Sequence, residues 1–132
     1  MAIKPVKELV AEANAQVTTH TPKEALARQS SGSAILVDIR DIRELGREGR
    51  INEAVHAPRG MLEFWFDPQS PYHRDVFADE NKEYVLFCAA GWRSALAAKA
   101  LKDMGFENTS HVEGGFGGLK EEGAQIDNAD QS

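Results

Sequence analysis

The chain has 132 residues, enough for one domain with a single hydrophobic core, and its hydrophobic content of 42% is ordinary for a soluble globular protein. A net charge of −6 argues against a nucleic-acid partner, which requires clustered Lys and Arg. No apolar run is long enough to span a bilayer, so we expect no membrane association. A single cysteine excludes an internal disulfide, and without an export signal a reducing cytoplasm is the expected location.

The amino-terminal part of the chain predicts two helices on either side of a short strand. Apolar residues recur with helical spacing through 5–15, and a strand is expected over 17–19. Thr21 and Glu24 form a capping-box pattern, with Pro22 at the first helical position. This pattern predicts the start of the second helix.

The middle of the chain alternates strands with short helices. A continuous apolar run at 34–37 predicts a strand of a parallel sheet that is covered on both faces. Asp41 and Glu44 repeat the capping pattern for a short helix over 42–46. The next expected elements are a polar turn at 47–50, a strand at 54–57, a helix at 59–66 and a loop at 67–73.

The carboxyl-terminal half begins with an apolar strand at 84–87 that ends at the only cysteine, Cys88. A helix follows and is expected to stop at Gly105. The core-facing stripe expected on this helix is Ala97, Ala100, Leu101 and Met104. After it we expect a strand at 108–112, a glycine-rich turn at 114–118, a helical turn at 119–122 and a polar, flexible tail at 123–132.

Strands that alternate with helices predict an α/β fold with a mostly parallel central sheet of about five strands and helices on both faces. We expect one domain over 1–132, with its core at about 16–122. In such folds the functional site lies beyond the carboxyl ends of the strands. That edge of the sheet is where Cys88 is expected.

Cys88 lies between a strand and a helix, where loop amides and the positive pole of the helix gather. Such a site favours a thiolate over a thiol, and Arg93 adds a permanent positive charge. Gly91 permits a crowded backbone, and Ala89 and Ala90 are small enough for amides to converge on one point. The alternative is that a cysteine after four apolar residues is a small buried hydrophobe. We interpret Cys88 as a nucleophile.

The pattern Cys88-x-x-Gly91-x-Arg93 resembles the active loop of the rhodanese-like domains. Other segments resemble further signatures of that family, namely Ile35–Arg40 with Glu44, Gly49–Ile51, Ala54–Pro58, Met104–Phe106 and Val112–Phe116. The similarity covers about residues 16–122. One departure is Arg50, where the family commonly has histidine.

The resemblance implies a rhodanese-like fold and sulfur transfer. In that family a cysteine thiolate takes the outer sulfur of a donor such as thiosulfate, holds it as a persulfide and passes it to a thiol or to cyanide. The site residues implied are Cys88 and Arg93 as catalytic groups, a substrate loop of Ala89, Ala90, Gly91, Trp92 and Ser94, and Asp38 and Arg40 in support. No metal or other cofactor is implied. Because the chain has one cysteine, the acceptor must be external: glutathione, thioredoxin or a partner protein.

Several roles stay open at this level. Arg93 either meets the anionic part of the donor or holds the loop through Asp38 or Glu44. Asp38 is more often a structural partner than a catalytic acid at such a position. Trp92 is either a wall of the entrance or part of the core.

The preferred sulfur donor is also open. Ala89 and Ala90 are uncharged, whereas family members that favour thiosulfate tend to carry cationic residues there. Because the net charge is negative, attraction of an anionic donor must be local. Further candidates for that attraction are Arg40, Arg43 and Arg59. The four histidines show no metal-ligand spacing and are expected to be structural or exposed; they are His20, His56, His73 and His111.

Two other functions compete with sulfur transfer. A phosphatase or arsenate reductase also uses a thiolate, an amide cradle and an arginine, but it places five residues between cysteine and arginine, whereas this chain has four. A non-enzymatic binding or sensor module shares the rhodanese-like fold. The intact Cys88 and Arg93 argue against an inactive relic.

Overall fold

The computed structural model of the chain describes residues 2–128. Within them, five strands form a central sheet: β1 (Thr19–His20), β2 (Ala34–Asp38), β4 (Val55–His56), β5 (Glu83–Phe87) and β6 (Thr109–Val112). Their order in the sheet is β1-β6-β5-β2-β4, and every neighbouring pair is parallel. The predicted parallel sheet of about five strands is therefore confirmed.

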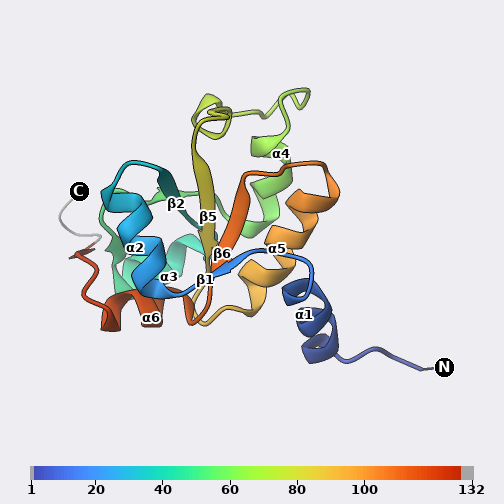
Figure 1. Cartoon of the computed structure of the whole chain (residues 1–132), viewed down its shortest axis with the longest axis horizontal. Helices are drawn as coiled ribbons and strands as arrows, with labels where there is room; N and C mark the ends of the chain where they lie inside the picture. Colours follow the sequence, from blue (N-terminus) through green and yellow to red (C-terminus); the bar gives the residue numbers. More distant parts are fainter. Residues whose placement is uncertain (1, 129–132) are drawn as a thin grey trace.

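Helices cover both faces of this sheet, as Figure 1 shows. The helices on one face are α1 (Val6–Asn14), α4 (Leu62–Phe66) and α5 (Trp92–Asp103). Those on the other face are α2 (Pro22–Ser30), α3 (Ile42–Glu48) and α6 (Gly115–Glu121). The predicted α/β class, with helices on both faces, is confirmed.

Strand β5 contributes to the apolar cluster on each face because successive side chains of a strand point to opposite sides. Tyr84 and Leu86 pack in the cluster under α4 and α5, and Cys88, two residues further on, belongs to the same cluster. Val85 and Phe87 pack in the cluster under α2 and α6. The alternation therefore directs the Cys88 side chain toward α5.

Both predicted capping boxes are present. In the first, the Glu24 amide donates to Thr21 Oγ1 at 3.1 Å and the Thr21 amide donates to Glu24 Oε1 at 2.8 Å. In the second, the Asp41 amide donates to Glu44 Oε2 at 2.9 Å and starts α3. This helix continues to Glu48, two residues beyond the predicted end, before Gly49 stops it.

Three apolar residues that share the expected helical spacing are on the surface instead. Val6 and Leu9 of α1 are exposed, because this helix packs against α5 only through Val10 and Ala13. Met104, expected in the core-facing stripe of α5, is also exposed, since it follows the last helical residue.

A small second sheet was not predicted. β3 (Arg50–Ile51) pairs antiparallel with β7 (Ile126–Asp127), where the sequence had suggested a polar turn and a flexible tail. Ile51 is buried, and Ile126 packs against the same apolar cluster, which explains why this part of the tail is ordered. The tail residues 129–132 lie outside the described residues.

Three further differences concern short elements. The predicted strand at 17–19 is β1, shifted to Thr19–His20. The predicted glycine-rich turn at 114–118 is mostly helix, because α6 already begins at Gly115. Single turns of 3-10 helix are present at η1 (Arg59–Met61) and η2 (Asp75–Phe77).

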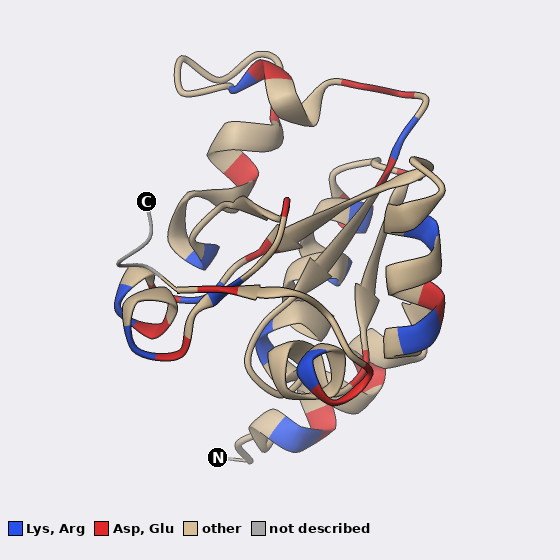
Figure 2. Ribbon diagram, turned by 90° about the vertical axis from the view of Figure 1, so that its left-hand side faces the viewer, with Lys and Arg blue, Asp and Glu red and all other residues tan. Residues whose placement is uncertain are grey.

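Charged residues of both signs are interspersed along the helices (Figure 2). Exposed pairs one turn apart, such as Lys99–Asp103 at 2.7 Å, stabilise a helix by only a few tenths of a kcal/mol, about 0.2–0.5. Among residues 2–128, no helix combines the length and the apolar character that a membrane span requires.

Candidate active site

Cys88 follows β5 directly, at the carboxyl edge of the sheet. The register pairs Asp38, the last residue of β2, with Phe87. The Ile39 amide then donates to the Phe87 carbonyl at 3.0 Å, so the two chains still run together where β5 ends. Cys88 therefore lies beyond the carboxyl ends of the strands, as predicted.

The sulfur of Cys88 is buried: the residue is 1% exposed. The nucleophile predicted from the sequence would be accessible, but the alternation of β5 turns Sγ inward beneath the first turn of α5. Its surroundings are nevertheless polar. The Gly91 amide donates to Sγ at 3.1 Å, and Ser94 Oγ lies 3.6 Å from Sγ.

The amide cradle is smaller than the sequence suggested. Of the loop amides expected to converge on the sulfur, in the described part of the chain the one hydrogen-bonded to Sγ is that of Gly91. Gly91 has a φ of +118°, a left-handed conformation that glycine adopts without strain. This conformation turns its amide to the sulfur just before α5 begins.

The turn into α6 holds the backbone of the cysteine loop from the other face. The Phe116 amide donates to the Cys88 carbonyl at 2.7 Å, and the Gly117 amide donates to the Ala89 carbonyl at 3.4 Å. A side chain at Gly115 would place its Cβ 2.4 Å from the Cys88 carbonyl oxygen. The sequence-level site did not include Gly115, although the close approach needs a glycine there.

Arg93 holds α3 through a two-pronged ion pair with Glu44. Its Nη1 and Nη2 donate to the two Glu44 carboxylate oxygens at 2.9 and 3.0 Å. These hydrogen bonds lower the pKa of Glu44 to about 2, against the opposing effect of its burial. The Arg93 side chain stays 43% exposed, and of the two partners considered the structure has Glu44, not Asp38.

Asp38 and Arg40 form a buried ion pair. Arg40 Nη2 donates to Asp38 Oδ2 at 2.8 Å and to the Gly49 carbonyl at 2.9 Å. The guanidinium also lies over the Phe116 ring, 4.1 Å from its centroid. The Arg40 side chain is 0% exposed, so its guanidinium is not available to an anionic donor at the surface.

Like Arg93, the two other proposed cations are paired with carboxylates. Arg43 pairs with Asp41 at 2.9 Å, and Arg59 pairs with Glu63 at 2.7 Å. Arg93 differs from them in its place in the chain, because it is the second residue of α5 and directly follows the cysteine loop.

The remaining loop residues differ in exposure. Ala90 is exposed, Ala89 is half-buried and Ser94 is fully buried. Trp92 is 54% exposed, so it lies on the surface beside the loop and is not core packing.

Comparison with known proteins decides the family. A family model described as "Rhodanese-like domain" matches residues 21–122. The chain belongs to the rhodanese-like domain family. The protein named "Putative sulfurtransferase YtwF" from Bacillus subtilis (strain 168) is 33% identical over 101 residues, which are 76% of this chain and 85% of that protein.

Solved structures agree with the rhodanese-like fold. A protein from Rhodopseudomonas palustris CGA009, described as a "Protein of Unknown Function RPA3614, Possible Tyrosine Phosphatase", is 44% identical, with a TM-score of 0.89 over 96% of this chain and 97% of that one. The thiosulfate sulfurtransferase from Pseudomonas aeruginosa is 20% identical, with a TM-score of 0.75 over 91% of this chain and 22% of that one. At that identity the likeness shows the fold alone.

His111, for which the sequence predicted a structural or an exposed role, has the structural one: it is buried and hydrogen-bonded. What the sequence did not show is its neighbour in the fold, because its Nδ1 lies 2.9 Å from Ser94 Oγ. The sequence signal was weak, because His111 is simply the third residue of a short strand. Among the described residues, no group of three or more His, Cys, Asp or Glu is placed to hold a metal ion.

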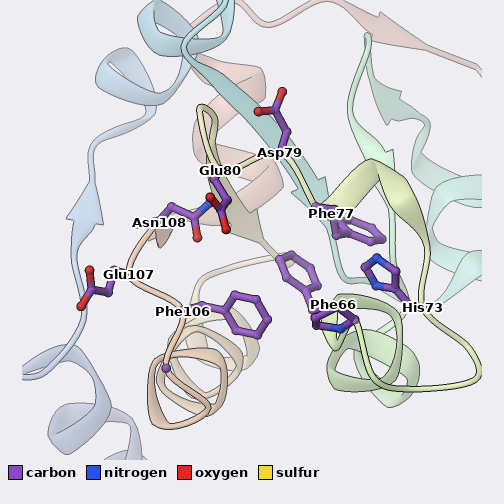
Figure 3. Close-up of a pocket in the computed structure, with 11 residues that line it drawn as sticks. Phe66, His73, Phe77, Asp79, Glu80, Phe106, Glu107 and Asn108 are labelled. Atoms are coloured by element: carbon purple, nitrogen blue, oxygen red, sulfur yellow. The ribbon is translucent and has the colours of Figure 1, made fainter.

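Two hollows in the protein surface differ in their position relative to the cysteine loop. One of about 330 Å³ adjoins the cysteine loop and is lined in part by Gly91, Trp92 and His111. A larger one of about 630 Å³ lies at the opposite end of the strands (Figure 3). Phe66 beneath it is almost fully buried, and the larger hollow contains none of the predicted site residues.

Proposed function

We propose that this rhodanese-like protein is a sulfurtransferase that carries sulfur on Cys88. The observation that carries the proposal is the placement of the only cysteine: it ends β5, its Sγ accepts the Gly91 amide at 3.1 Å, and the positive pole of α5 lies above it. Family membership supports a sulfurtransferase type of enzyme. Thiosulfate as donor and a persulfide intermediate are parts of the proposal.

The proposed reaction has two displacements. In the first, the Cys88 thiolate attacks the outer sulfur of thiosulfate, the sulfur–sulfur bond of the donor breaks, and sulfite leaves with the bonding electrons. In the second, an external thiolate or cyanide attacks the terminal sulfur of the persulfide, and the Cys88 thiolate is restored. The Gly91 amide is a fixed dipole that stabilises negative charge on sulfur in both states.

The buried sulfur sets a condition on this chemistry. Because Cys88 is 1% exposed and the loop residues Ala90 and Trp92 lie outside it, a donor reaches Sγ only when the loop moves. A small donor needs the least movement. The acceptor is an external thiol, such as glutathione, thioredoxin or a partner protein, and the reducing cytoplasm is the compartment that supplies such thiols.

The test is the mass of the intact protein after incubation with thiosulfate. We expect a gain of one sulfur atom, its loss on treatment with a thiol or cyanide, and no gain in Cys88→Ser. The matched variant Ser33→Ala, remote from the loop, should load like the wild-type protein. A protein that binds thiosulfate but never gains sulfur would be a binding or sensor module instead.

A phosphatase is the second candidate, because the Rhodopseudomonas palustris protein is described as a possible one. Four residues separate Cys88 from Arg93, one fewer than in phosphatase loops, and the smaller loop suits a single sulfur atom better than a tetrahedral oxyanion. Hydrolysis of an aryl phosphate by the wild-type protein, absent in Cys88→Ser and without any sulfur loading, would favour the phosphatase.

Replacing Arg93 with alanine is expected to slow sulfur loading by about tenfold to a hundredfold, because the cation nearest the loop is removed. The free energy of unfolding should fall by about 1 kcal/mol or less, since the Arg93–Glu44 pair is partly exposed. Loading rates by mass spectrometry and urea unfolding measure the two effects.

Glu44→Gln is the matched control for Arg93. Glutamine keeps the capping bond to the Asp41 amide but releases Arg93 from its ion pair. We expect a smaller loss of loading rate than in Arg93→Ala. Equal losses would mean that Arg93 acts by tethering the loop to α3, and a collapse of the melting temperature in Arg93→Ala would assign it to structure.

A further inference from the structure

A chain of hydrogen-bonding groups leads away from Cys88 through the interior. Cys88 Sγ lies 3.6 Å from Ser94 Oγ, and Ser94 Oγ lies 2.9 Å from His111 Nδ1. On the far side of the ring, His111 Nε2 lies 2.8 Å from Asn14 Oδ1 and 3.2 Å from Thr19 Oγ1. Ser94 and His111 are buried, so these contacts replace water for both groups.

The partners fix the direction of the hydrogen bonds. Asn14 Oδ1 can only accept, so His111 Nε2 carries the ring hydrogen and Nδ1 presents a lone pair. Ser94 then donates its hydroxyl hydrogen to Nδ1, in preference to the Gly91 carbonyl at 3.3 Å. Its oxygen is left to accept from the Cys88 thiol. The thiol therefore donates to Ser94, and Ser94 donates to His111.

The surroundings of His111 keep the ring neutral. Burial lowers its pKa to about 4, and the charge of His20 acts in the same direction. The titratable groups that face it are Cys88 through Ser94 and His20 on β1, while Glu113 lines the hollow beside it. A neutral ring can accept a proton on one nitrogen while it releases the proton of the other nitrogen. The ring then does not have to carry both protons at once.

The hydrogen-bonded series that starts at Cys88 ends at a hollow in the protein surface. His111, Asn14 and Thr19 all line the hollow of about 330 Å³ beside the loop. Cys88 is 1% exposed, so the proton of its thiol has no direct route to solvent. The hydrogen-bonded chain connects the buried thiol with that opening.

We propose that Ser94 and His111 form a proton relay that carries the thiol proton of Cys88 to the hollow beside α1. The thiol proton moves to Ser94 Oγ, the hydroxyl hydrogen moves to His111 Nδ1, and the Nε2 proton leaves to a solvent base in the hollow. Afterwards Nδ1 donates to Ser94, and Ser94 donates to the Cys88 thiolate. On the other side of the ring, Nε2 then accepts from the Thr19 hydroxyl, and the Asn14 amide turns over to present its NH2 group. His111 is thus a positioning residue whose tautomer follows the ionisation of Cys88.

This relay concerns the thiol proton, so it stands whether or not sulfur transfer is the reaction. The test uses the single cysteine, whose alkylation by iodoacetamide measured against pH reports thiolate alone. Nitrogen NMR spectra of the imidazole rings over the same pH range report which nitrogen of His111 carries hydrogen. We expect Nδ1 to become protonated, and Nε2 to lose its hydrogen, at the pH where alkylation rises.

Ser94→Ala breaks the link and leaves both ends in place. We expect the alkylation midpoint to rise by about one pH unit, a tenfold slower reaction at neutral pH, and the change of His111 tautomer to disappear. Ser94→Thr should restore both. His56, which bonds the Arg40 carbonyl, is the internal control in the same spectra. A His111 tautomer that stays constant while wild-type Cys88 ionises would overturn the relay, and that measurement needs no variant.

Discussion

Replacing Arg40 with methionine is expected to lower the free energy of unfolding by about 3–5 kcal/mol, because it leaves the buried carboxylate of Asp38 without its partner. Asp38 accepts hydrogen bonds from Arg40 Nε at 3.0 Å and from Nη2 at 2.8 Å. Methionine fills much of the volume but can supply neither bond. The stacking of the guanidinium on Phe116 is lost as well.

The chain contains its own control for this change. The tripeptide Asp38-Ile39-Arg40 is followed at once by Asp41-Ile42-Arg43, with the same spacing of opposite charges. The Arg43 side chain is 80% exposed, so Arg43→Met should leave the free energy of unfolding nearly unchanged. Urea unfolding at neutral pH measures both variants. Equal losses in Arg40→Met and Arg43→Met would show that burial of the first pair adds nothing to stability.

The sequence predicted those elements whose signals are local. Thr21 with Glu24, and Asp41 with Glu44, start helices where they were expected, because a capping box is formed by residues three positions apart. The apolar strands before Asp38 and Cys88 were equally clear. The loop from Cys88 to Arg93 was located for the same reason, since strand, cysteine and helix are contiguous in the chain.

Contacts between distant segments could not be predicted in the same way. Arg50–Ile51 pairs with Ile126–Asp127, across more than half the chain, and two residues of strand give little periodicity to recognise. The two Asp-Ile-Arg tripeptides have the same sequence, and only the fold buries one and exposes the other. The link from Ser94 to His111 joins a helix to a strand, α5 to β6, and no pattern in the sequence indicates which residue of β6 faces Ser94.

The exposure of Cys88 is the clearest case in which a local signal was incomplete. The strand alternation that was visible in the sequence already placed Cys88 on the side of Tyr84 and Leu86. What the sequence did not show is that α5 covers this side closely enough to leave Cys88 1% exposed. The site therefore combines a buried sulfur with polar neighbours, Gly91 and Ser94, and not an open thiolate.

Replacing Gly115 with alanine is expected to lower the free energy of unfolding by about 3 kcal/mol and to change the alkylation rate of Cys88. Gly115 has a φ of +54°, which costs a residue with a side chain about 1 kcal/mol or more. Its added Cβ would lie 2.4 Å from the Cys88 carbonyl oxygen and 2.8 Å from the Ala89 carbonyl carbon, so the backbone of the loop must shift. Since the Phe116 amide holds that same Cys88 carbonyl, the shift reaches the cysteine.

Gly117→Ala, two residues further along α6, is the matched control. An added Cβ there would find its nearest neighbour, the Ala89 carbonyl oxygen, at 3.9 Å, which is ordinary contact. Alanine is a better helix former than glycine, so this variant should be more stable than the wild type by up to about 1 kcal/mol, with unchanged alkylation. The two substitutions are chemically identical and differ only in the space beside the loop. If Gly115→Ala has the same free energy of unfolding as Gly117→Ala, the turn before α6 does not constrain Cys88. If Gly115→Ala loses stability but keeps the alkylation rate of the wild type, the contact supports the fold without setting the position of the sulfur.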